Sequence, residues 1–207
     1  MTAANGALIL AAGQSRRMGD IHKLLAPLGG RPLIAHSIEH ILAAGFVRPI
    51  VVLGARAEEM RAAVRPYDVE TVDAADYARG MAHSLRAGLA AVPHHWAHLL
   101  ICLGDMAHVA TATYEALRLH PASATQVVVP HYQGQRGNPM RWGRHYFAQL
   151  AAGTGDVGGR AILDGADVVA WPCDDPGILQ DIDTPEALAQ ARAAYASSSP
   201  KTLPRNT

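Results

Sequence analysis

The sequence of 207 residues has little cysteine, no excess of either charge and no long hydrophobic run. Its only cysteines, Cys102 and Cys173, form no CxxC pair, so nothing suggests a zinc or redox centre, and we expect a reducing cytoplasmic location. The 18 Lys and Arg residues balance the 18 Asp and Glu residues, which argues against nucleic acid or an anionic membrane as a partner. The chain has no run of about 18 apolar residues and no basic segment near its first residue, so we expect neither a membrane span nor a signal peptide.

Hydrophobic residues make up 49% of the chain, which is enough for one well-packed α/β domain. We place this domain at residues 1–196. The stretch "SSSPKTLPRNT" at 197–207 mixes serine, proline and polar residues without periodicity, and we expect it to form a disordered tail.

Short apolar runs bounded by glycine or aspartate alternate with longer segments of helical periodicity. The apolar runs predict strands at 7–12, 49–54, 98–105, 126–132 and 167–173. The periodic segments predict helices at 31–45, 57–65, 81–92, 111–120 and 184–196. In the last of these helices, Thr184 is expected to be the N-cap residue, followed by Pro185 in the first turn.

This alternation predicts a mostly parallel sheet with right-handed crossovers and helices on both faces, a three-layer α/β/α fold of the Rossmann-like kind. Most of the strands are apolar along their whole length and do not alternate with polar residues. We therefore expect neither of their faces to be exposed to solvent. Ligands of such sheets bind at the carboxyl ends of the strands. The stretch "AAGQSRRMG" (11–19) follows the first strand and "GDM" (104–106) ends the third, so both are expected at one edge of the sheet.

The loop after the first strand combines small residues with positive charge. Glycine at position 13 allows a ligand to approach the backbone closely, while Arg17 and Lys23 could bind phosphate oxygens. The spacing fits neither the Walker motif GxxxxGK[ST] nor the dinucleotide motif GxGxxG. Chemistry alone therefore leaves two interpretations open, a phosphate-binding loop or a solvated turn with ordinary surface charges.

The stretch "LAAGQSRRMG" followed by "KLL" resembles the signature xAAGxSxRMGxxK of the MobA-like nucleotidyltransferase family, and it resembles the molybdenum cofactor cytidylyltransferases of that family most closely. Three further parts of the chain match the same family in the same order. They are "GMAHSLRAGL" (80–89), "GQRGNPMRW" (134–142) with "GDVGGRAIL" (155–163), and "DIDTPEAL" (181–188). The similarity covers roughly residues 7–195 and also implies a nucleotidyltransferase fold of the GT-A-like type.

The resemblance implies a magnesium-dependent enzyme that transfers CMP from CTP to molybdopterin and releases pyrophosphate, with a molybdoenzyme maturation chaperone as a further partner. CTP is preferred because the cytidylyl branch tends to have "AAG", as in Ala11-Ala12-Gly13, where the guanylyl branch has "AGG". Two alternatives remain open. One is a relative that uses GTP or another acceptor, and the other is a non-transferring accessory protein or a relative recruited to a reaction such as reduction.

The resemblance also assigns roles to residues, with the nucleotide in the N-terminal half of the domain and the acceptor in the C-terminal half. The catalytic residues would be Arg17, Lys23 and Asp105. The nucleotide would contact Leu10, Ala11, Ala12, Gly13, Ser15, Arg17, Met18, Gly19, Lys23, Gly80, Ser84 and Asp105. The acceptor would contact Arg136, Gly137, Asn138, Pro139, Asp156, Gly158 and Arg160. Asp105 and Asp183, at the ends of neighbouring strands, would hold magnesium, whose preferred ligands are carboxylate, phosphate and water oxygens.

Simpler roles remain open for three of these residues: Asp105 as a strand end or helix cap, Asp183 as part of the capping arrangement before the last helix, and Arg136 as an exposed turn residue. Arg16 falls on a variable position of the signature and is expected to face water. The chain departs from the family after "GDM", because Ala107 and His108 stand where a proline usually follows. This places an imidazole near the expected metal and affects the prediction of the substrate most.

Overall fold

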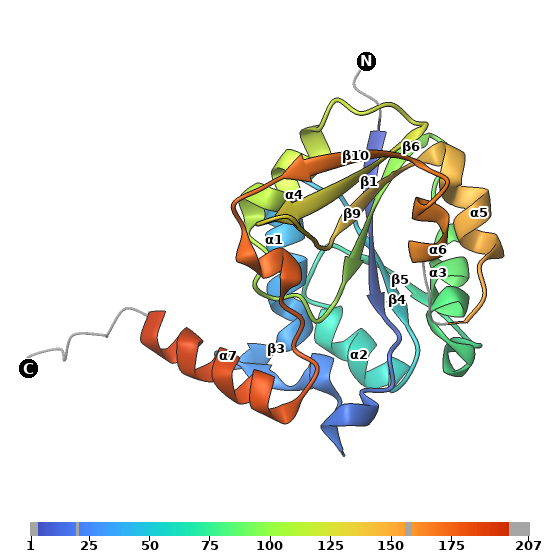
Figure 1. Ribbon diagram of the computed structural model, residues 1–207. Helices are drawn as coiled ribbons and strands as arrows, with labels where there is room; N and C mark the ends of the chain where they lie inside the picture. The colour runs from blue at the N-terminus through green and yellow to red at the C-terminus, as the bar shows by residue number, and fades with distance from the viewer. Residues whose placement is uncertain (1–3, 20, 156–158, 199–207) are drawn as a thin grey trace, which may run out of the picture.

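A central β-sheet with helices on both of its faces forms the frame of the computed structural model, which describes residues 4–19, 21–155 and 159–198 (Figure 1). This arrangement confirms the predicted three-layer α/β fold with a mostly parallel sheet. No helix in these ranges is long and apolar enough to cross a membrane.

The sheet has eight strands in the order β10–β7–β9–β6–β1–β4–β5, with the short β8 paired to β7. Its pairs are parallel except at β8 and at β9, which runs antiparallel to both of its neighbours. A separate ribbon joins β2 to β3. The strands are β1 Ala4–Ala11, β2 Pro27–Leu28, β3 Arg31–Pro32, β4 Ile50–Leu53, β5 Glu70–Asp73, β6 Trp96–Leu103, β7 Gln126–Tyr132, β8 Gln135–Arg136, β9 Met140–Gly143 and β10 Asp167–Pro172.

Seven α-helices and five short 3-10 helices connect the strands in the described part of the chain. The α-helices are α1 Leu33–Ala43, α2 Ala57–Val64, α3 Met81–Ala90, α4 Thr111–Leu119, α5 Phe147–Ala152, α6 Arg160–Leu163 and α7 Pro185–Ser198. The 3-10 helices are η1 Arg16–Met18, η2 Lys23–Leu25, η3 Tyr77–Arg79, η4 Arg144–Tyr146 and η5 Pro176–Leu179. At the start of α7, the Thr184 hydroxyl accepts a hydrogen bond from the Ala187 N–H (3.2 Å), which confirms the predicted N-cap.

Two hydrophobic cores lie on opposite faces of the sheet. Helices α1, α2 and α4 pack on one face, against side chains such as Ile9 of β1 and Val51 of β4. Helices α3, α5 and α6 pack on the other face, against Leu8 and Val52 of the same strands. Neighbouring residues of one strand thus point into different cores, and all four of these side chains are completely buried. The central strands are therefore covered on both faces, as their composition predicts.

The structure differs from the sequence-based expectation in several places. It adds elements that the sequence does not predict, namely β5 and β9 of the main sheet, the two-residue strands β2, β3 and β8, and the helices α5 and α6. The predicted strand β10 lies at one edge of the sheet and is largely exposed, so the expectation of burial fails there. The last helix continues through Ser198, two residues past the expected start of the tail, and residues 199–207 lie outside the described range.

Candidate active site

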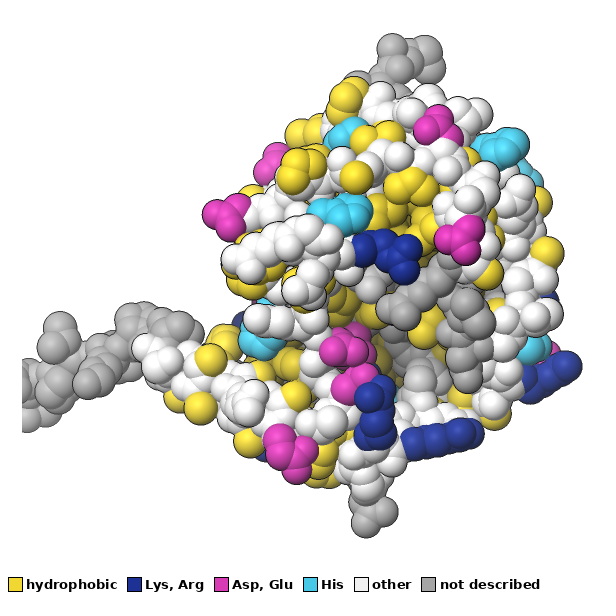
Figure 2. All heavy atoms as spheres, viewed as in Figure 1, with side chains coloured by type: hydrophobic (Ala, Val, Ile, Leu, Met, Phe, Trp, Pro, Cys, Tyr) yellow, Lys and Arg dark blue, Asp and Glu magenta, His cyan; other side chains and the backbone are white. Residues whose placement is uncertain are grey.

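A cleft of about 490 Å³ opens at the carboxyl ends of β1 and β6. It lies between the loop that follows β1, residues 12–19, which we call the glycine loop, and the segment 77–84 that includes η3 and the start of α3. Figure 2 shows acidic and basic side chains next to each other where this face of the molecule is hollowed. The position agrees with the rule that ligands of parallel sheets bind at the carboxyl ends of the strands.

The cleft brings together most of the residues that the sequence assigns to nucleotide binding. These are Leu10, Ala12, Gly13, Ser15, Arg17, Lys23, Gly80, Ser84 and Asp105. The side chains of Ala11 and Met18 belong to the hydrophobic core instead, with 1% and 3% of their surface exposed. Gly19 is exposed but does not line the cleft. The nucleotide roles of these last three residues stay predictions.

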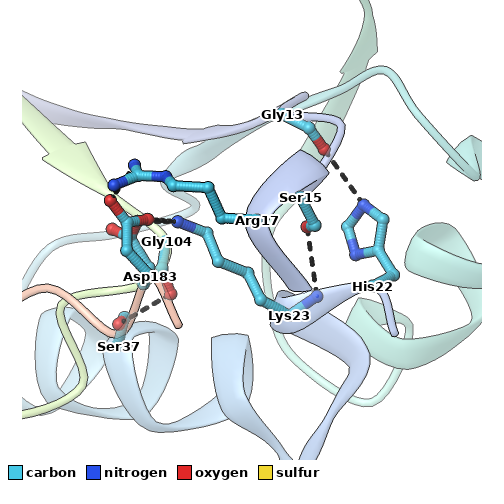
Figure 3. A network of polar contacts seen from close by, with 9 residues as sticks. Gly13, Ser15, Arg17, His22, Lys23, Ser37, Gly104 and Asp183 are labelled. Carbon is cyan, nitrogen blue, oxygen red and sulfur yellow. Dashed lines mark hydrogen bonds and ion pairs between the residues drawn. The ribbon is translucent and has the colours of Figure 1, made fainter. Parts of the chain in front are cut away.

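Two hydrogen bonds hold the glycine loop against the start of η2 (Figure 3). The Lys23 backbone N–H donates to the Ser15 hydroxyl (3.1 Å), and His22 Nε2 donates to the Gly13 carbonyl (3.1 Å). Ser15 has φ 53°, a left-handed conformation that is uncommon for a residue with a side chain, so the loop depends on such contacts. They fix the loop relative to the lysine.

Three aspartates meet at the floor of the cleft. Asp105 follows β6, while Asp181 and Asp183 lie in the segment between η5 and α7, and one carboxylate oxygen from each lies within 4.8 Å of the others. The expectation that Asp183 ends a strand next to that of Asp105 is therefore wrong. Ile182 anchors the segment, because its side chain is 2% exposed and its N–H donates to the Asp105 carbonyl (3.3 Å). The sequence analysis missed Asp181.

Two basic side chains pair with these carboxylates. Lys23 Nζ forms ion pairs with Asp105 and Asp183, and Arg17 pairs with Asp183 (Figure 3). Burial disfavours the charged form of Lys23, but its two carboxylate partners outweigh this effect and raise its pKa. Burial likewise acts to raise the pKa of Asp183, but its hydrogen bond and charge interaction with Lys23 lower it overall. Both groups are therefore held in their charged forms at neutral pH.

Asp181 behaves differently from Asp183. Burial, followed by the charge of Asp183 beside it, raises the pKa of Asp181. Three carboxylates this close repel one another, and the two positive charges of Lys23 and Arg17 do not balance all three. An additional cation in the cleft would relieve this repulsion.

The residues present fit a hard divalent cation. The second oxygen of Asp105, Oδ1, is buried and has no hydrogen-bond partner among the described residues. A buried carboxylate oxygen without a partner is costly, whereas a cation would satisfy it. The donor set consists of oxygens only, which is the set that magnesium and manganese prefer. Because Lys23 now pairs with the same carboxylates, a cation would have to share these oxygens with the lysine.

Among the residues assigned to the acceptor, Arg136, Gly137, Asn138 and Pro139 are fully described, and none of these four lines this cleft. Arg136 is exposed on β8, and the Gly137 N–H donates to the Pro130 carbonyl (2.9 Å). A Cβ atom at Gly137 would lie 2.6 Å from the Ile178 carbonyl oxygen, so this glycine is needed for packing. The Asn138 N–H donates to the same carbonyl (2.9 Å).

Other parts of the predicted acceptor site are described less fully. Pro139 is buried after a cis peptide bond with Asn138. Asp156 and Gly158 lie outside the described residues, as does the side chain of Arg160 at the start of α6. The acceptor roles of all these residues stay predictions.

A second cavity, of about 560 Å³, lies at the carboxyl ends of β7 and β10. It is lined by His131, Tyr132, Gln133, Gly134, Ala170, Pro172, Cys173 and Asp174. Arg136 pairs with His131 in the hairpin of β7 and β8, and Gly137, Asn138 and Pro139 follow β8, but none of these four residues lines this cavity.

The structure also places residues that the sequence leaves without a role. Arg16 is exposed, as expected, but it also lines the cleft, where its Nε donates to the Gln14 side-chain carbonyl (2.7 Å). Further lining residues that the sequence missed are Gln14, Leu24, Tyr77, Ala78, Arg79, Met81, Leu103 and Asp181. His108 is exposed and does not line the cleft, so its proximity to the expected metal stays a prediction.

Comparison with known proteins gives a family and several similar chains. A family model described as a MobA-like NTP transferase domain matches residues 7–170. Over 126 residues the chain is 38% identical to the bifunctional protein GlmU of Rhizorhabdus wittichii, a match that covers 59% of this chain but only 28% of GlmU. Over 193 residues it is 31% identical to the nicotine blue oxidoreductase of Paenarthrobacter nicotinovorans, covering 87% of this chain and 93% of that protein.

Solved structures show the same fold. The structure of Rv0371c from Mycobacterium tuberculosis H37Rv is 31% identical, with a TM-score of 0.82, and the match covers 93% of this chain and 100% of that chain. A second structure of Rv0371c, described as a complex with manganese, matches with a TM-score of 0.75 at 26% identity over the same shares of the two chains.

Proposed function

This chain belongs to the MobA-like NTP transferase family, and we propose that it transfers CMP from CTP to the phosphate of molybdopterin and releases pyrophosphate. The observation that supports this function best is the arrangement at the floor of the cleft. Three carboxylates and two cations, Lys23 and Arg17, converge there beside a glycine loop. Transfer of a nucleotidyl group requires both kinds of charge, because the triphosphate and its counter-ion must bind together.

The reaction needs no nucleophile from the protein. An oxygen of the acceptor phosphate attacks the α-phosphorus of the triphosphate and forms a new P–O bond, while the bond from the α-phosphorus to the bridging oxygen breaks and pyrophosphate leaves. Catalysis then depends on positioning the two substrates and on stabilising negative charge. This step requires no reactive side chain beyond the charged residues of the cleft.

The basic residues act on the phosphates. Arg17 presents a planar group that can donate two hydrogen bonds to phosphate oxygens, and Lys23 contributes a compact charge from a partly buried position. When CTP binds, its phosphates compete with Asp105 and Asp183 for Lys23. The lysine thereby stabilises the charge that develops on the leaving pyrophosphate.

The acidic residues would hold the metal. When bound, magnesium would neutralise the phosphate oxygens, and Asp105, Asp181 and Asp183 would be its protein ligands. The manganese complex of the similar Rv0371c supports a divalent-metal requirement. Asp105 would then have a partner for its buried Oδ1.

The choice of CTP and molybdopterin rests on sequence rather than on the shape of the cleft. Ala12 lines the cleft as the middle residue of the "AAG" triplet and supports CTP over GTP. The stretches "GQRGNPMRW" and "GDVGGR" support a molybdopterin acceptor. A relative with the same chemistry and a different base or acceptor is the nearest alternative.

A second candidate function is an oxidoreductase activity. The similarity to nicotine blue oxidoreductase supports it, since that match extends over 87% of the chain at 31% identity. The three carboxylates favour the transferase, because reduction of an organic dye makes no use of a hard cation site.

The test incubates the purified protein with magnesium, molybdopterin and one nucleoside triphosphate at a time, and measures the release of pyrophosphate. We expect release with CTP that depends on both magnesium and molybdopterin. Release with GTP alone would overturn the choice of base. If no triphosphate gives pyrophosphate and the protein instead decolourises nicotine blue with a reduced nicotinamide as electron donor, the oxidoreductase is the correct function.

A further inference from the structure

His22 is a buried side chain that contacts the glycine loop from behind. The residue is 5% exposed, and its Nε2 lies 3.1 Å from the Gly13 carbonyl oxygen. Since a carbonyl can only accept, the proton of the ring must sit on Nε2. Burial lowers the pKa of His22, so the ring is neutral at pH 7 and Nε2 carries its only proton. The contact is therefore a directed hydrogen bond from the ring to the loop.

This hydrogen bond fixes the orientation of one peptide group. The bond between Gly13 and Gln14 is trans, so the Gly13 carbonyl and the Gln14 N–H point in opposite directions. The carbonyl points towards His22, behind the loop, and Gln14 lines the cleft in front of it. The Gln14 N–H has no acceptor within the described ranges. It is thus available to an anion in the cleft.

His22 also connects the loop to the neighbouring lysine. The Lys23 side chain enters the cleft, and its backbone N–H donates to the Ser15 hydroxyl (Figure 3). His22 and Lys23 together therefore hold the glycine loop at two points, 13 and 15. The loop and the ammonium group of the lysine keep a fixed relative position as a result.

A purely structural role does not account well for this histidine. Its other ring nitrogen, Nδ1, is buried without a hydrogen-bond partner in the described part of the chain. A buried acceptor without a donor destabilises the fold. An apolar side chain in the same place would avoid this cost but would release the Gly13 carbonyl.

We propose that His22 is a positioning residue for the triphosphate: by holding the Gly13 carbonyl behind the glycine loop, it directs the Gln14 amide into the cleft as a donor to a phosphate oxygen. This inference rests on the proposed function of the cleft. The residue does not touch the reacting atoms and acts through the loop alone. Loss of the histidine should therefore weaken triphosphate binding more than it weakens acceptor binding or the stability of the fold.

His36 provides a matched control. It is also 5% exposed, its Nε2 also lies near a backbone carbonyl, that of Leu28 (2.9 Å), and burial also lowers its pKa. Leu28 lies in β2 and does not line the cleft. The two histidines differ mainly in the place of the carbonyl that they bind. For His22 this carbonyl belongs to the loop beside the cleft, and for His36 it belongs to a strand outside the cleft.

The experiment compares His22→Leu, His22→Asn and His22→Gln with His36→Leu. The leucine removes the donor, the asparagine is too short to reach Gly13, and the glutamine can place an N–H near the position of Nε2. Binding of CTP and of inorganic tripolyphosphate is measured by calorimetry, the KM for CTP and for the acceptor is measured by pyrophosphate release, and thermal unfolding is recorded for every variant.

We expect His22→Leu and His22→Asn to bind CTP and tripolyphosphate about tenfold more weakly, the loss of one hydrogen bond to a charged group. The KM for CTP should rise by a similar factor while the KM for the acceptor stays constant. His22→Gln should recover most of the affinity, and His36→Leu should bind CTP like the unchanged protein even if it unfolds at a lower temperature.

Equal affinity of His22→Leu and the unchanged protein would overturn the inference, as would an equal loss in His36→Leu. If His22→Leu does not fold, the asparagine and glutamine variants decide by the same comparison. If the unchanged protein binds neither CTP nor tripolyphosphate, the proposed function itself is wrong, which separates that failure from a failure of the role of His22.

Discussion

The two halves of the proposed substrate site differ in whether their residues line a common cleft. In the nucleotide half, residues from the glycine loop, from the end of β6 and from the segment before α7 converge in a single cleft. In the acceptor half, Arg136 is exposed and Gly137 is packed against η5, and neither lines that cleft. The motif resemblance thus corresponds to residues that line one cleft in the nucleotide half, whereas the described acceptor residues 136–139 line neither cavity.

The difference shows in which part of the fold a sequence motif alone is enough to predict that residues come together in space. The glycine loop follows β1 and Asp105 follows β6. These neighbouring strands are buried on both faces and paired along their length, so the sheet brings these two parts of the nucleotide half together. In the acceptor half, Arg136 lies in β8, a strand of two residues at one side of the sheet, and Gly137, Asn138 and Pro139 lie between β8 and β9. Their arrangement depends on loops, which the sheet does not fix.

The strongest test of the nucleotide half is Asp105→Asn. We expect pyrophosphate release to fall by a factor on the order of 10³, because the metal loses a charged ligand at the point where phosphate charge develops. The fold should persist, since Asp105 Oδ1 has no hydrogen-bond partner in the described structure to lose, and Lys23 keeps its ion pair with Asp183 when its pair with Asp105 is lost. Activity is measured as pyrophosphate release and folding by circular dichroism.

Asp175→Asn is the matched comparison, because Asp175 is buried and accepts hydrogen bonds from Ala110 N–H, the Thr113 hydroxyl and Gly177 N–H. It should lose about 1–3 kcal/mol of stability with its KM values unchanged. If Asp105→Asn also loses only stability, the metal site is not where we place it.

A smaller effect is expected for Lys23→Gln. Loss of the ammonium leaves Asp105 and Asp183 without their shared counter-charge and removes one cation from the triphosphate. Affinity for CTP should fall by about 10²-fold, while affinity for magnesium alone should not fall, because the lysine competes with the metal for the same oxygens. Calorimetric titrations with CTP and with magnesium measure the two effects separately.

The control for the lysine is Arg61→Gln, which breaks an exposed ion pair with Asp73, and neither residue lines the cleft. Exposed pairs contribute little, so binding of CTP should not change. A loss of magnesium affinity in Lys23→Gln would contradict the assignment of one shared set of oxygens.

The packing role of the acceptor half is tested by Gly137→Ala. The new Cβ would lie 2.6 Å from the Ile178 carbonyl oxygen, so β8 and η5 must move apart, at a cost of about 1–3 kcal/mol in the free energy of unfolding. Gly165→Ala is the control, because its Cβ would have no neighbour within 4 Å. Chemical denaturation of both variants measures the difference, and equal stabilities would show that the close contact at Gly137 can relax freely.

The smallest effect is expected for Arg136→Gln. If the acceptor half binds the phosphate of molybdopterin as proposed, the KM for the acceptor should rise by about tenfold through loss of a charge-assisted hydrogen bond. The KM for CTP and the stability should not change, since Arg136 is exposed and lies outside the nucleotide cleft. Steady-state kinetics with each substrate varied in turn decide this, and an unchanged acceptor KM would leave Arg136 as an ordinary surface residue.

The sequence predicts the parts of the fold whose pattern is unambiguous. The apolar run at 126–132 coincides with β7, and Thr184 acts as the N-cap of α7. Strand β9 escapes prediction because it contains Arg141, which is only 3% exposed and whose pKa burial lowers to about 10. Charged residues usually lie on the surface, so a segment that contains an arginine is not predicted to be a buried central strand.

In the candidate site, too, some residues could be predicted from the sequence and others could not. Arg17, Lys23 and Asp105 could be found from the family signature and from their position after buried strands. Asp181 could not be found in that way, yet a local signal was present: Ile182 is buried, and in an extended segment the residues on either side of it point to the opposite face. Applied to "DID", alternation alone would have placed both aspartates towards the cleft.

The cleft is completed by residues that are far apart along the chain. Asp183 follows Arg17 by 166 positions and Lys23 by 160. During synthesis on the ribosome, the glycine loop and Asp105 emerge early, whereas two of the three carboxylates emerge only after the entire sheet. A nascent or prematurely terminated chain that stops before residue 181 therefore carries the glycine loop without the full acidic cluster. If the three carboxylates hold the metal as proposed, such a chain cannot be active, and activity requires translation past the last strand.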